Sequence, residues 1–366
     1  MIGIRNVKRI AKYVIYNIQA LFLYFFSRQI LIQPPDGVIF ITHNLGGGTE
    51  NYVKDVQQEN SITILRKIGF GRDRFFELSY ENKKKIIKEN QLFEVLKGYQ
   101  EYFINSLVGF SMKMEILSFL LEEKQRRDIH LWYVLHDFDC ICKNNFNLIR
   151  KGYYCKLNCQ LCELNDDLYT KIWKEFLMHC DEIRCFSLSS SIILRQRYTS
   201  LAAERIKIVP HNIDYCNFFS PLKIERQELH IGFVGNCNSI SKGRDIVVPF
   251  LGYCKKNKIK VTVIGKFNVE NRVYGERIQY LGKYRNTDLG NILQQSGVNV
   301  VFFTSVWPET FSYLISELMA LNIPICCFDI GAQGEKIGGY EYGHLIHYGD
   351  AENMFRQIAA FWKSLE

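Results

Sequence analysis

The sequence predicts an α/β protein built from two doubly wound domains that face each other across a cleft. Short apolar runs alternate with amphipathic helical stretches along most of the 366 residues, and this alternation restarts after an interruption at 212–228. Runs that are apolar on both faces and separated by helices are typical of a parallel sheet covered on both sides. The length also favours two domains over one.

The first domain is expected over residues 36–215, with strands at 38–43, 61–68, 102–108 and 129–136. The second is expected over 216–350, with strands at 230–235, 260–265, 277–282, 299–304 and 323–329. Residues 351–366 are expected to form a C-terminal helix that can pack back on the first domain. Because ligands of open α/β sheets bind at the carboxyl ends of the strands, we expect the functional residues there.

The composition narrows the classes of function. The formal net charge of +8 fits an anionic ligand or a membrane surface, and no basic run interleaved with aromatic residues suggests nucleic acid. The twelve cysteines are unevenly spaced, and no cleavable signal peptide is recognisable. These features favour a reducing cytoplasm over a disulfide framework.

The segment 1–35 has the outline of a basic amphipathic helix. Its cations are Arg5, Lys8, Arg9 and Lys12, and they precede the apolar stretch YVIYNIQALFLYFF at 13–26. That stretch is shorter than the ~20 residues needed to span a bilayer. It can lie in the membrane interface with its cations near anionic headgroups. The alternative is a helix packed on the domain or on a partner chain.

The stretch PETFSYLISE at 308–317 carries two carboxylates at the opening of a helix. Glu309 is expected in the loop that follows a strand, and Glu317 about two turns into the helix. The expected donors to a diphosphate are the backbone amides of Phe311, Ser312 and Tyr313. The alternative is that both acids serve the helix dipole, which explains Glu309 better than Glu317.

A second phosphate signal is GFVGNCNSISKG at 232–243. Gly235 ends a predicted strand, and Lys242 precedes Gly243 at the start of the next helix. Glycines allow a phosphate to approach the backbone closely, and the lysine supplies a charge for it. A solvated loop lysine is the competing interpretation.

Together these stretches resemble the E-x7-E motif and donor site of retaining GT-B glycosyltransferases that use nucleotide sugars, family four of that classification. THNLGGGTENYVKDV at 42–56 resembles that family's glycine-rich first loop, and IVPHNID at 208–214 resembles its interdomain segment. The stretch 305–337 resembles its donor-binding core, in which Gly331 and Ala332 occupy the place of a small-residue turn against the donor.

The resemblance implies that Glu317 binds the ribose, Glu309 the donor sugar and Lys242 the diphosphate. The family commonly has an arginine where this chain has Asn236, so neutralisation of the diphosphate falls to Lys242 alone or to Lys266. Asn212 replaces the family's interdomain glycine; asparagine also tolerates positive φ, so the turn can survive.

The resemblance also implies that His136, which with Asp137 closes a predicted strand, lies beside the transferred sugar. A satisfied core histidine is the alternative. Gly46, Gly47 and Gly48 precede Thr49, a predicted helix cap, and this loop can contact the donor phosphates or the acceptor. Three glycines also serve a plain turn.

A cysteine-rich insertion is expected at 140–162. Cys142, Cys155, Cys159 and Cys162 can supply four thiolates to one structural zinc ion, and Cys140 lies just upstream. The spacing is looser than that of a paired C-x2-C ribbon, and buried thiols are the alternative. No metal is expected in catalysis.

The expected reaction is transfer of a sugar from a nucleoside diphosphate sugar to an acceptor hydroxyl with retention of configuration. The basic N-terminal segment favours a saccharide or lipid-linked saccharide acceptor, with the protein in the cytoplasm or peripheral on the inner face of the membrane. Two alternatives belong to other classes, namely a sugar-nucleotide epimerase of the same fold and a non-catalytic interaction module.

Overall fold

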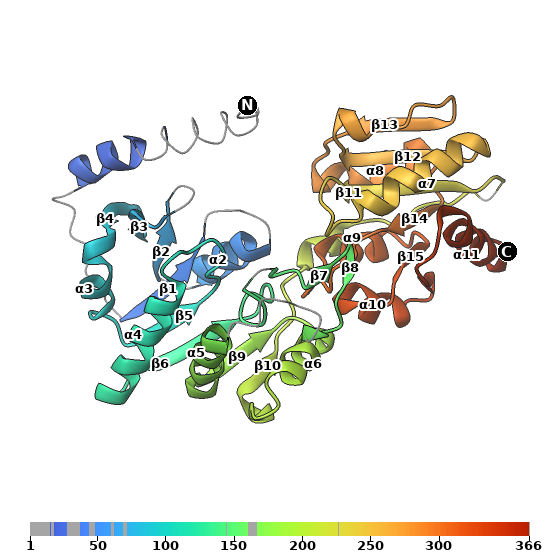
Figure 1. Ribbon diagram of the computed structural model, residues 1–366. Helices are drawn as coiled ribbons and strands as arrows, with labels where there is room; N and C mark the ends of the chain where they lie inside the picture. The colour runs from blue at the N-terminus through green and yellow to red at the C-terminus, as the bar shows by residue number, and fades with distance from the viewer. Residues whose placement is uncertain are drawn as a thin grey trace, which may run out of the picture. The chain divides into compact units, whose positions relative to one another are not determined.

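The computed structural model describes residues 15, 18–27, 37–43, 48–59, 62–68, 72–143, 145–159, 167–225 and 227–365. The chain divides into two compact units (Figure 1). The first unit comprises residues 1–146, 162–186 and 193–209, and the second comprises 147–161, 187–192 and 210–366. Each unit is built on its own sheet.

The first unit contains an eight-stranded sheet in the order β10-β9-β6-β5-β1-β2-β3-β4. Its strands are β1 (Val38–Thr42), β2 (Thr63–Lys67), β3 (Phe75–Tyr80), β4 (Lys83–Lys88), β5 (Glu101–Ile104), β6 (His130–Val134), β9 (Glu182–Cys185) and β10 (Ile206–Ile208). The helices of this part of the chain are α2 (Gly48–Glu59), α3 (Leu92–Leu96), α4 (Lys113–Arg126), α5 (Asp167–His179) and α6 (Leu188–Arg197).

An aromatic ladder crosses the parallel part of this sheet. Phe40 of β1 stacks on Phe103 of β5 with ring centroids 4.4 Å apart, and Phe103 stacks on Trp132 of β6 at 4.9 Å. The guanidinium of Arg184 on β9 lies 5.1 Å from the Trp132 ring centroid. Side chains on neighbouring strands that share a face stabilise the pairing, so the ladder fixes the register of four strands.

The hairpin formed by β3 and β4 departs from the predicted parallel sheet. β3 pairs antiparallel with β2 and with β4, which places β4 at the edge. The sequence of β4, KKKIIK, has no regular alternation and three lysines in succession, which hid the strand. Lysines on an edge strand discourage pairing with another chain.

The second unit contains a six-stranded parallel sheet in the order β13-β12-β11-β14-β15-β16. Its strands are β11 (His230–Asn236), β12 (Lys260–Lys266), β13 (Ile278–Gly282), β14 (Val300–Phe303), β15 (Ile325–Phe328) and β16 (Gly343–Ile346). Its helices are α7 (Arg244–Lys256), α8 (Leu289–Ser296), α9 (Tyr313–Ala320), α10 (Gly331–Gly338) and α11 (Ala351–Ser364). The sequence had predicted all of these strands except β16.

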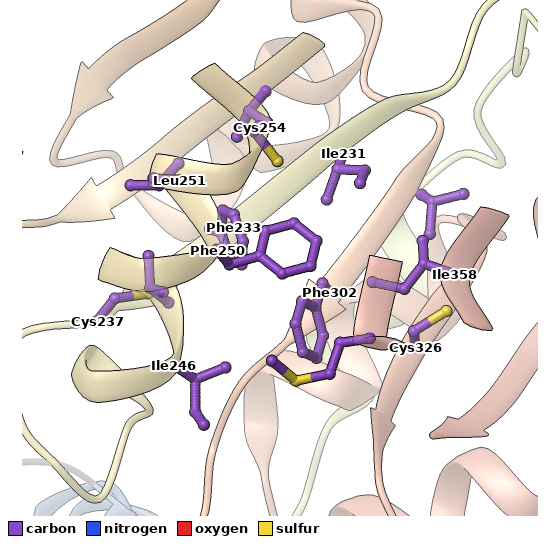
Figure 2. Packing of buried hydrophobic residues seen from close by; sticks show 14 of the residues in the cluster. Ile231, Phe233, Cys237, Ile246, Phe250, Leu251, Cys254, Phe302, Cys326 and Ile358 are labelled. Atoms are coloured by element: carbon purple, nitrogen blue, oxygen red, sulfur yellow. The ribbon is translucent and has the colours of Figure 1, made fainter. Parts of the chain in front are cut away.

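Each face of this sheet carries its own apolar core. On one face Phe233 and Phe302 pack with Phe250 of α7 and with Ile358 of α11 (Figure 2). On the other face, residues of α8 and α9 pack against alternate residues of the same strands. The sheet is therefore covered on both sides, as the apolar runs predict.

Several segments that were expected within the first domain or packed against it belong to the second unit, among them 187–192 and 210–215. The C-terminal helix α11 buries Met354, Ile358 and Phe361 in the core of the second unit. Residues 147–161 form the hairpin of β7 (Ile149–Arg150) and β8 (Tyr153–Tyr154), and Tyr153 packs edge-on against Tyr348 at 4.8 Å. The expected insertion at 140–162 is thus divided between the units.

The N-terminal segment is described only at residues 15 and 18–27, which are helical. Its basic residues lie outside the described part of the chain. Within that part, no helix is both long and apolar enough to cross a membrane.

Phe302 provides a test of the core of the second unit. Its ring contacts Phe233, Phe250 and Phe328 at centroid distances of 5.8, 5.4 and 5.7 Å. We expect Phe302→Ala to lower the free energy of unfolding by about 3–5 kcal/mol, because the cavity cannot close among rigid rings. Hydrogen exchange of the β14 amides measures this locally. The matched variant Phe218→Ala, at an exposed position of the same unit, should change it by less than about 0.5 kcal/mol.

Candidate active site

Two loops meet at the carboxyl edge of the second sheet. One follows β11 and ends at Gly243, and the other follows β14 and ends at Ser312, the residue before α9. The Val306 amide donates to the Ser241 carbonyl oxygen at 2.9 Å, and the Thr304 hydroxyl donates to the Lys242 carbonyl oxygen at 3.0 Å. These bonds hold the predicted lysine loop against the predicted glutamate loop.

Glycine is required at two points of this junction. Gly243 has a φ of +82°, and an added Cβ would collide with the carbonyl oxygen of Thr304. Gly331, at the start of α10, has a φ of +58°, and an added Cβ would lie 2.5 Å from Cα of Pro308. Both residues combine left-handed backbone with close approach, so any side chain would push the loops apart.

The loops bring Lys242 and Glu309 into direct contact. Nζ of Lys242 lies 2.5 Å from Oε1 of Glu309 and 5.5 Å from the centroid of the Trp307 ring. Glu309 is only 5% exposed, and its burial disfavours the charged carboxylate. The Lys242 ammonium and the hydrogen bonds of Lys242, Ser312 and Ser305 to this carboxylate together outweigh burial, so the pKa of Glu309 is lower than its ordinary value. Glu309 is therefore a carboxylate at neutral pH.

Gln333 of α10 fixes the glutamate loop from behind. Its side-chain oxygen accepts from the Glu309 amide at 3.1 Å, and its nitrogen donates to the Trp307 carbonyl oxygen at 2.7 Å. The Ala332 amide donates to the Glu309 carbonyl oxygen at 2.8 Å. The backbone on both sides of the carboxylate is thus anchored to α10. Sequence reasoning placed Gly331 and Ala332 here but missed Gln333.

The helix α9 begins at Tyr313, the last of the three residues expected at the start of the helix. Glu317 consequently lies just over one turn into the helix and not two. Phe311 and Ser312 precede the helix, and Ser312 adopts a left-handed φ of 62°. That conformation is costly for a residue with a side chain and directs the chain abruptly into the helix. The backbone N–H groups of its first turn have no acceptor within the helix.

Lys336 of α10 is a charged residue of this region that sequence reasoning missed. Its Nζ donates to the Ser312 carbonyl oxygen at 3.3 Å and to the Ser316 hydroxyl at 2.6 Å, and it lies 3.5 Å from the centroid of the Phe311 ring. Burial lowers the pKa of Lys336 to about 8. The lysine lies in the last turn of α10, where sequence alone suggests an ordinary surface charge.

Glu317 is held by two side chains from other elements. Its Oε1 accepts from the Tyr215 hydroxyl and from Nδ2 of Asn286, each at 2.8 Å. Glu317 is 2% exposed, and burial raises the pKa of its carboxyl in spite of both hydrogen bonds. Both bonds end on one oxygen, and no donor among the described residues reaches Oε2.

The segment 208–214 differs from expectation at Asn212. Asn212 does not adopt a left-handed φ; instead its Oδ1 accepts from the Asp214 amide at 2.7 Å, which closes the turn. The preceding His211 is buried between Phe311 and Tyr313, with both ring centroids 4.9 Å away. Burial lowers the pKa of His211 to about 3, so its ring is neutral at physiological pH.

Gly235 and Lys266 lie at the carboxyl ends of β11 and β12. The register pairs Gly235 with Gly265 and Asn236 with Lys266. Lys266 is exposed, and its carbonyl oxygen accepts from the Cys237 amide at 3.1 Å. Lys266 is therefore at the ligand-binding edge of the sheet, but its ammonium is not part of the Lys242–Glu309 contact.

In the first unit, three strand ends meet around Asn105. His136, just after β6, lies with Nε2 2.7 Å from Oδ1 of Asn105, and Nδ2 of Asn105 donates to the Thr42 hydroxyl at 3.0 Å. The His136 ring also packs against Tyr52 and Phe186, with centroids 5.3 and 4.8 Å away. His136 is thus at the carboxyl edge of its sheet, fixed in orientation by an amide and two rings.

Asp137 is a buried carboxyl beside His136. Its oxygens accept from the Ser106 hydroxyl at 3.1 Å and from the Asp139 amide at 2.8 Å, while Asp139 pairs with Lys113 at 2.5 Å. Burial, followed by repulsion from Asp139, raises the pKa of Asp137 to about 7. The charge of Lys113 therefore serves mainly Asp139.

Comparison with known proteins bears on the fold and on the second unit. Residues 228–364, which include Lys242, Glu309 and Glu317, match the family model of glycosyl transferases group 1. The chain is similar to the structure of HepE from Anabaena, solved in complex with UDP, at 13% identity, with 90% of this chain and 91% of that chain covered and a TM-score of 0.56. The chain has the GT-B fold.

Two further structures share this GT-B fold. Sucrose-phosphate synthase from Thermosynechococcus elongatus is 15% identical to this chain. The superposition covers 89% of each of the two chains, with a TM-score of 0.56. The lipopolysaccharide outer core galactosyltransferase WaaB in its apo form is 13% identical, covers 90% of each chain and gives a TM-score of 0.57. A comparison with curated protein sequences finds no match.

The remaining predicted residues are only partly described. Gly47 lies outside the described residues, and Gly48 is the first residue of α2. Cys162 also lies outside them, while Cys142 belongs to the first unit and Cys155 and Cys159 to the second. Within the described part of the chain, no group of three or more His, Cys, Asp or Glu residues is placed to hold a metal ion. The zinc site therefore stays a prediction.

The raised pKa of Asp137 makes the stability of the first unit depend on pH. From the ordinary value of 3.8 up to about 7, the folded state holds a proton that the unfolded state has lost, so stability falls as pH rises through this window. Asp137→Asn keeps an acceptor for the Asp139 amide and removes the titration. We expect the variant to gain a few kcal/mol relative to the parent protein between pH 5 and pH 8. Unfolding at both pH values measures this, and a constant difference would contradict the assignment.

Proposed function

We propose that the protein is a retaining glycosyltransferase that moves a sugar from a nucleoside diphosphate sugar to a hydroxyl of an acceptor. The observation that carries the proposal is the pair of the half-buried Lys242 with the buried Glu309 at the approach to α9, inside the stretch that matches glycosyl transferases group 1. Its support is the convergence, at one sheet edge, of a cation, two carboxylates and a helix start.

In this proposal the diphosphate binds at the start of α9. Lys242 and the amides of Phe311, Ser312 and Tyr313 would face its oxygens, since a helix N-terminus and an ammonium both favour negative charge. Lys242 already pairs with Glu309 at 2.5 Å, so an incoming diphosphate would take over part of that contact. Gly235 would allow close approach of the backbone, and Lys266 would add charge at the same edge.

The sugar and the ribose would lie on either side of the diphosphate. Glu309, partly released from Lys242, would accept from hydroxyls of the transferred sugar and orient it. Glu317 would accept from the ribose through Oε2, because Tyr215 and Asn286 already occupy Oε1. In the first unit, His136 would contact the transferred sugar, and the loop that contains Gly47 and Gly48 would contact the donor phosphates or the acceptor.

The proposed transfer depends on stabilising the charges that develop as the sugar leaves the diphosphate. When the bond to the sugar breaks, positive charge develops on the ring and negative charge on the departing diphosphate. Lys242 and fixed amide dipoles stabilise the departing charge without reorganising, which is where electrostatic catalysis is most effective. Glu309 is assigned to orientation of the donor and not to covalent attack. These groups require no divalent cation for the leaving group.

The acceptor class is proposed from surface features of the first unit. A saccharide or a lipid-linked saccharide, presented at the cytoplasmic face of a membrane, fits the basic character of the chain. A screen of common nucleotide sugars for release of the free nucleoside diphosphate tests the donor half directly. Release from no donor, together with no nucleotide binding by calorimetry, would overturn the proposal.

Lys242 is the residue whose loss should affect the chemical step most. We expect Lys242→Ala to lower kcat for donor hydrolysis by about 100- to 1000-fold, the usual effect of removing one electrostatic stabiliser. Lys266→Ala serves as the matched variant and should cost less, because its ammonium lies apart from Glu309. Equal losses in both variants would argue against a special role for Lys242.

Glu317 provides a separate test of nucleotide recognition. Glu317→Ala should weaken nucleoside diphosphate binding by at least about tenfold, because a hydrogen bond to a charged acceptor contributes about 1.5–3 kcal/mol. Tyr215→Phe removes one internal bond to the same carboxylate but spares the oxygen assigned to the ligand. Calorimetry should therefore show a much smaller loss for Tyr215→Phe. A large drop in thermal stability of Glu317→Ala with unaltered affinity would show that the carboxylate is only structural.

A further inference from the structure

The described N-terminal helix, residues 18–27, contacts the first unit along one narrow face. Ala20, Tyr24 and Ser27 are buried, and they recur at helical spacing. The Ser27 hydroxyl accepts from the Ile86 amide of β4 at 2.9 Å. Nζ of Lys88 lies 4.5 Å from the centroid of the Tyr24 ring. These contacts fix which side of the helix faces outward.

The outward side of this helix is apolar. Phe22 and Phe26 are 63% and 72% exposed, and their rings pack in a tilted arrangement with centroids 4.5 Å apart. The other exposed apolar side chains of the helix are Ile18, Leu21, Leu23 and Phe25. Exposed apolar side chains gathered on one element mark an interaction surface, whereas single ones do not.

Cations surround this apolar side. The helix lies next to the hairpin of β3 and β4 (Figure 1). Lys83 and Lys84, beside the turn of this hairpin, are exposed. A cavity of about 990 Å³ opens beside the helix, with apolar walls that include Leu21 and Phe93 and with Arg72, Arg74 and Lys88 among its lining residues. Two of these charges are offset, because Glu89 pairs with Arg72 at 3.5 Å and Glu77 pairs with Lys84 at 3.3 Å. The net charge of these basic residues and their acidic partners stays positive.

We propose that the exposed side of helix 18–27 and the basic β3–β4 hairpin together form a docking surface for an anionic phospholipid bilayer. Aromatic and aliphatic side chains enter the acyl boundary, while flanking lysines and arginines remain at the headgroups. A protein partner fits less well, since lysine is depleted in the cores of protein interfaces. The cavity has the combination that one lipid requires, namely an apolar wall for a chain and cations for a phosphate. The inference does not depend on the proposed transfer reaction.

Co-sedimentation of the full chain with vesicles tests the surface. We expect binding to vesicles of phosphatidylglycerol and phosphatidylcholine, little binding to phosphatidylcholine alone, and weaker binding as salt is raised. The double variant Phe22→Glu with Phe26→Glu should lose at least tenfold in partitioning. The matched variant Leu168→Glu, at an exposed position of α5 in the same unit, should bind as the parent protein does.

The charge contribution has its own pair of variants. Lys83→Ala with Lys84→Ala should lower partitioning about 25-fold, at about fivefold for each lysine near an anionic surface. Lys255→Ala with Lys256→Ala removes the same charge from exposed positions of α7 in the second unit and should have no effect. Equal losses in the two pairs would mean that only net charge matters and would overturn the assignment.

Two further outcomes would contradict the proposal. One is absence of binding to either type of vesicle. The other is a dimer, seen by sedimentation velocity, that the substitutions at Phe22 and Phe26 dissociate, since the surface would then cover a second copy of the chain. Hydrolysis of a nucleotide sugar in solution should be unchanged in every variant of this section. A failure of vesicle binding therefore leaves the proposed reaction standing, and the reverse also holds.

Discussion

Lys242 and Glu309 lie 67 residues apart in the chain, yet their side chains form the ion pair around which the second unit's loops are arranged. A charge as buried as Glu309 is costly unless a partner and hydrogen bonds compensate it. The backbone geometry that brings the partner close depends on Gly243 and Gly331, where no side chain fits. Gln333 then prevents the glutamate loop from relaxing away. The sheet supplies the framework, and the Lys242–Glu309 contact joins the loops that follow β11 and β14.

In the first unit, neutral groups and not charges fix a side chain at the carboxyl edge of the sheet. At its carboxyl edge, Asn105 links the end of β1 to His136, so the histidine is oriented by an amide and not by a charge. The ion pair of this edge, Lys113 with Asp139, does not include His136 or Asn105. The carboxyl edges of the two sheets therefore differ in character. The second carries an ion pair, and the first carries a fixed, mostly neutral polar group of side chains.

The strands of the second unit could be predicted because they are buried on both faces. A strand in that position has a continuous apolar run, which is visible in the sequence itself. The hairpin of β3 and β4 could not, since Lys83, Lys84 and Lys85 make an edge strand look like a solvated loop. The lysine, the acids and the helix start of the donor region were evident as a spaced motif. Their neighbours Gln333 and Lys336 could not be predicted. Each contacts a loop that lies 24 residues earlier in the chain, and no local pattern indicates such a contact. The placement of 147–161 in the second unit likewise depends on long-range packing of Ile149 and Tyr153 that no local pattern records.

Under the proposed function, Glu317 is a buried acid that would serve structure and recognition together. Tyr215 and Asn286 come from two separate segments that both precede α9 in sequence, and both donate to the same oxygen. Such an arrangement fixes the plane of the carboxylate while one oxygen stays an acceptor, which is the condition for binding a hydroxyl without reorganisation. Burial keeps the pKa raised as long as only two neutral donors face the group. Each further hydroxyl donor would stabilise the charged form and lower that pKa, so ligand binding and ionisation of Glu317 should favour each other.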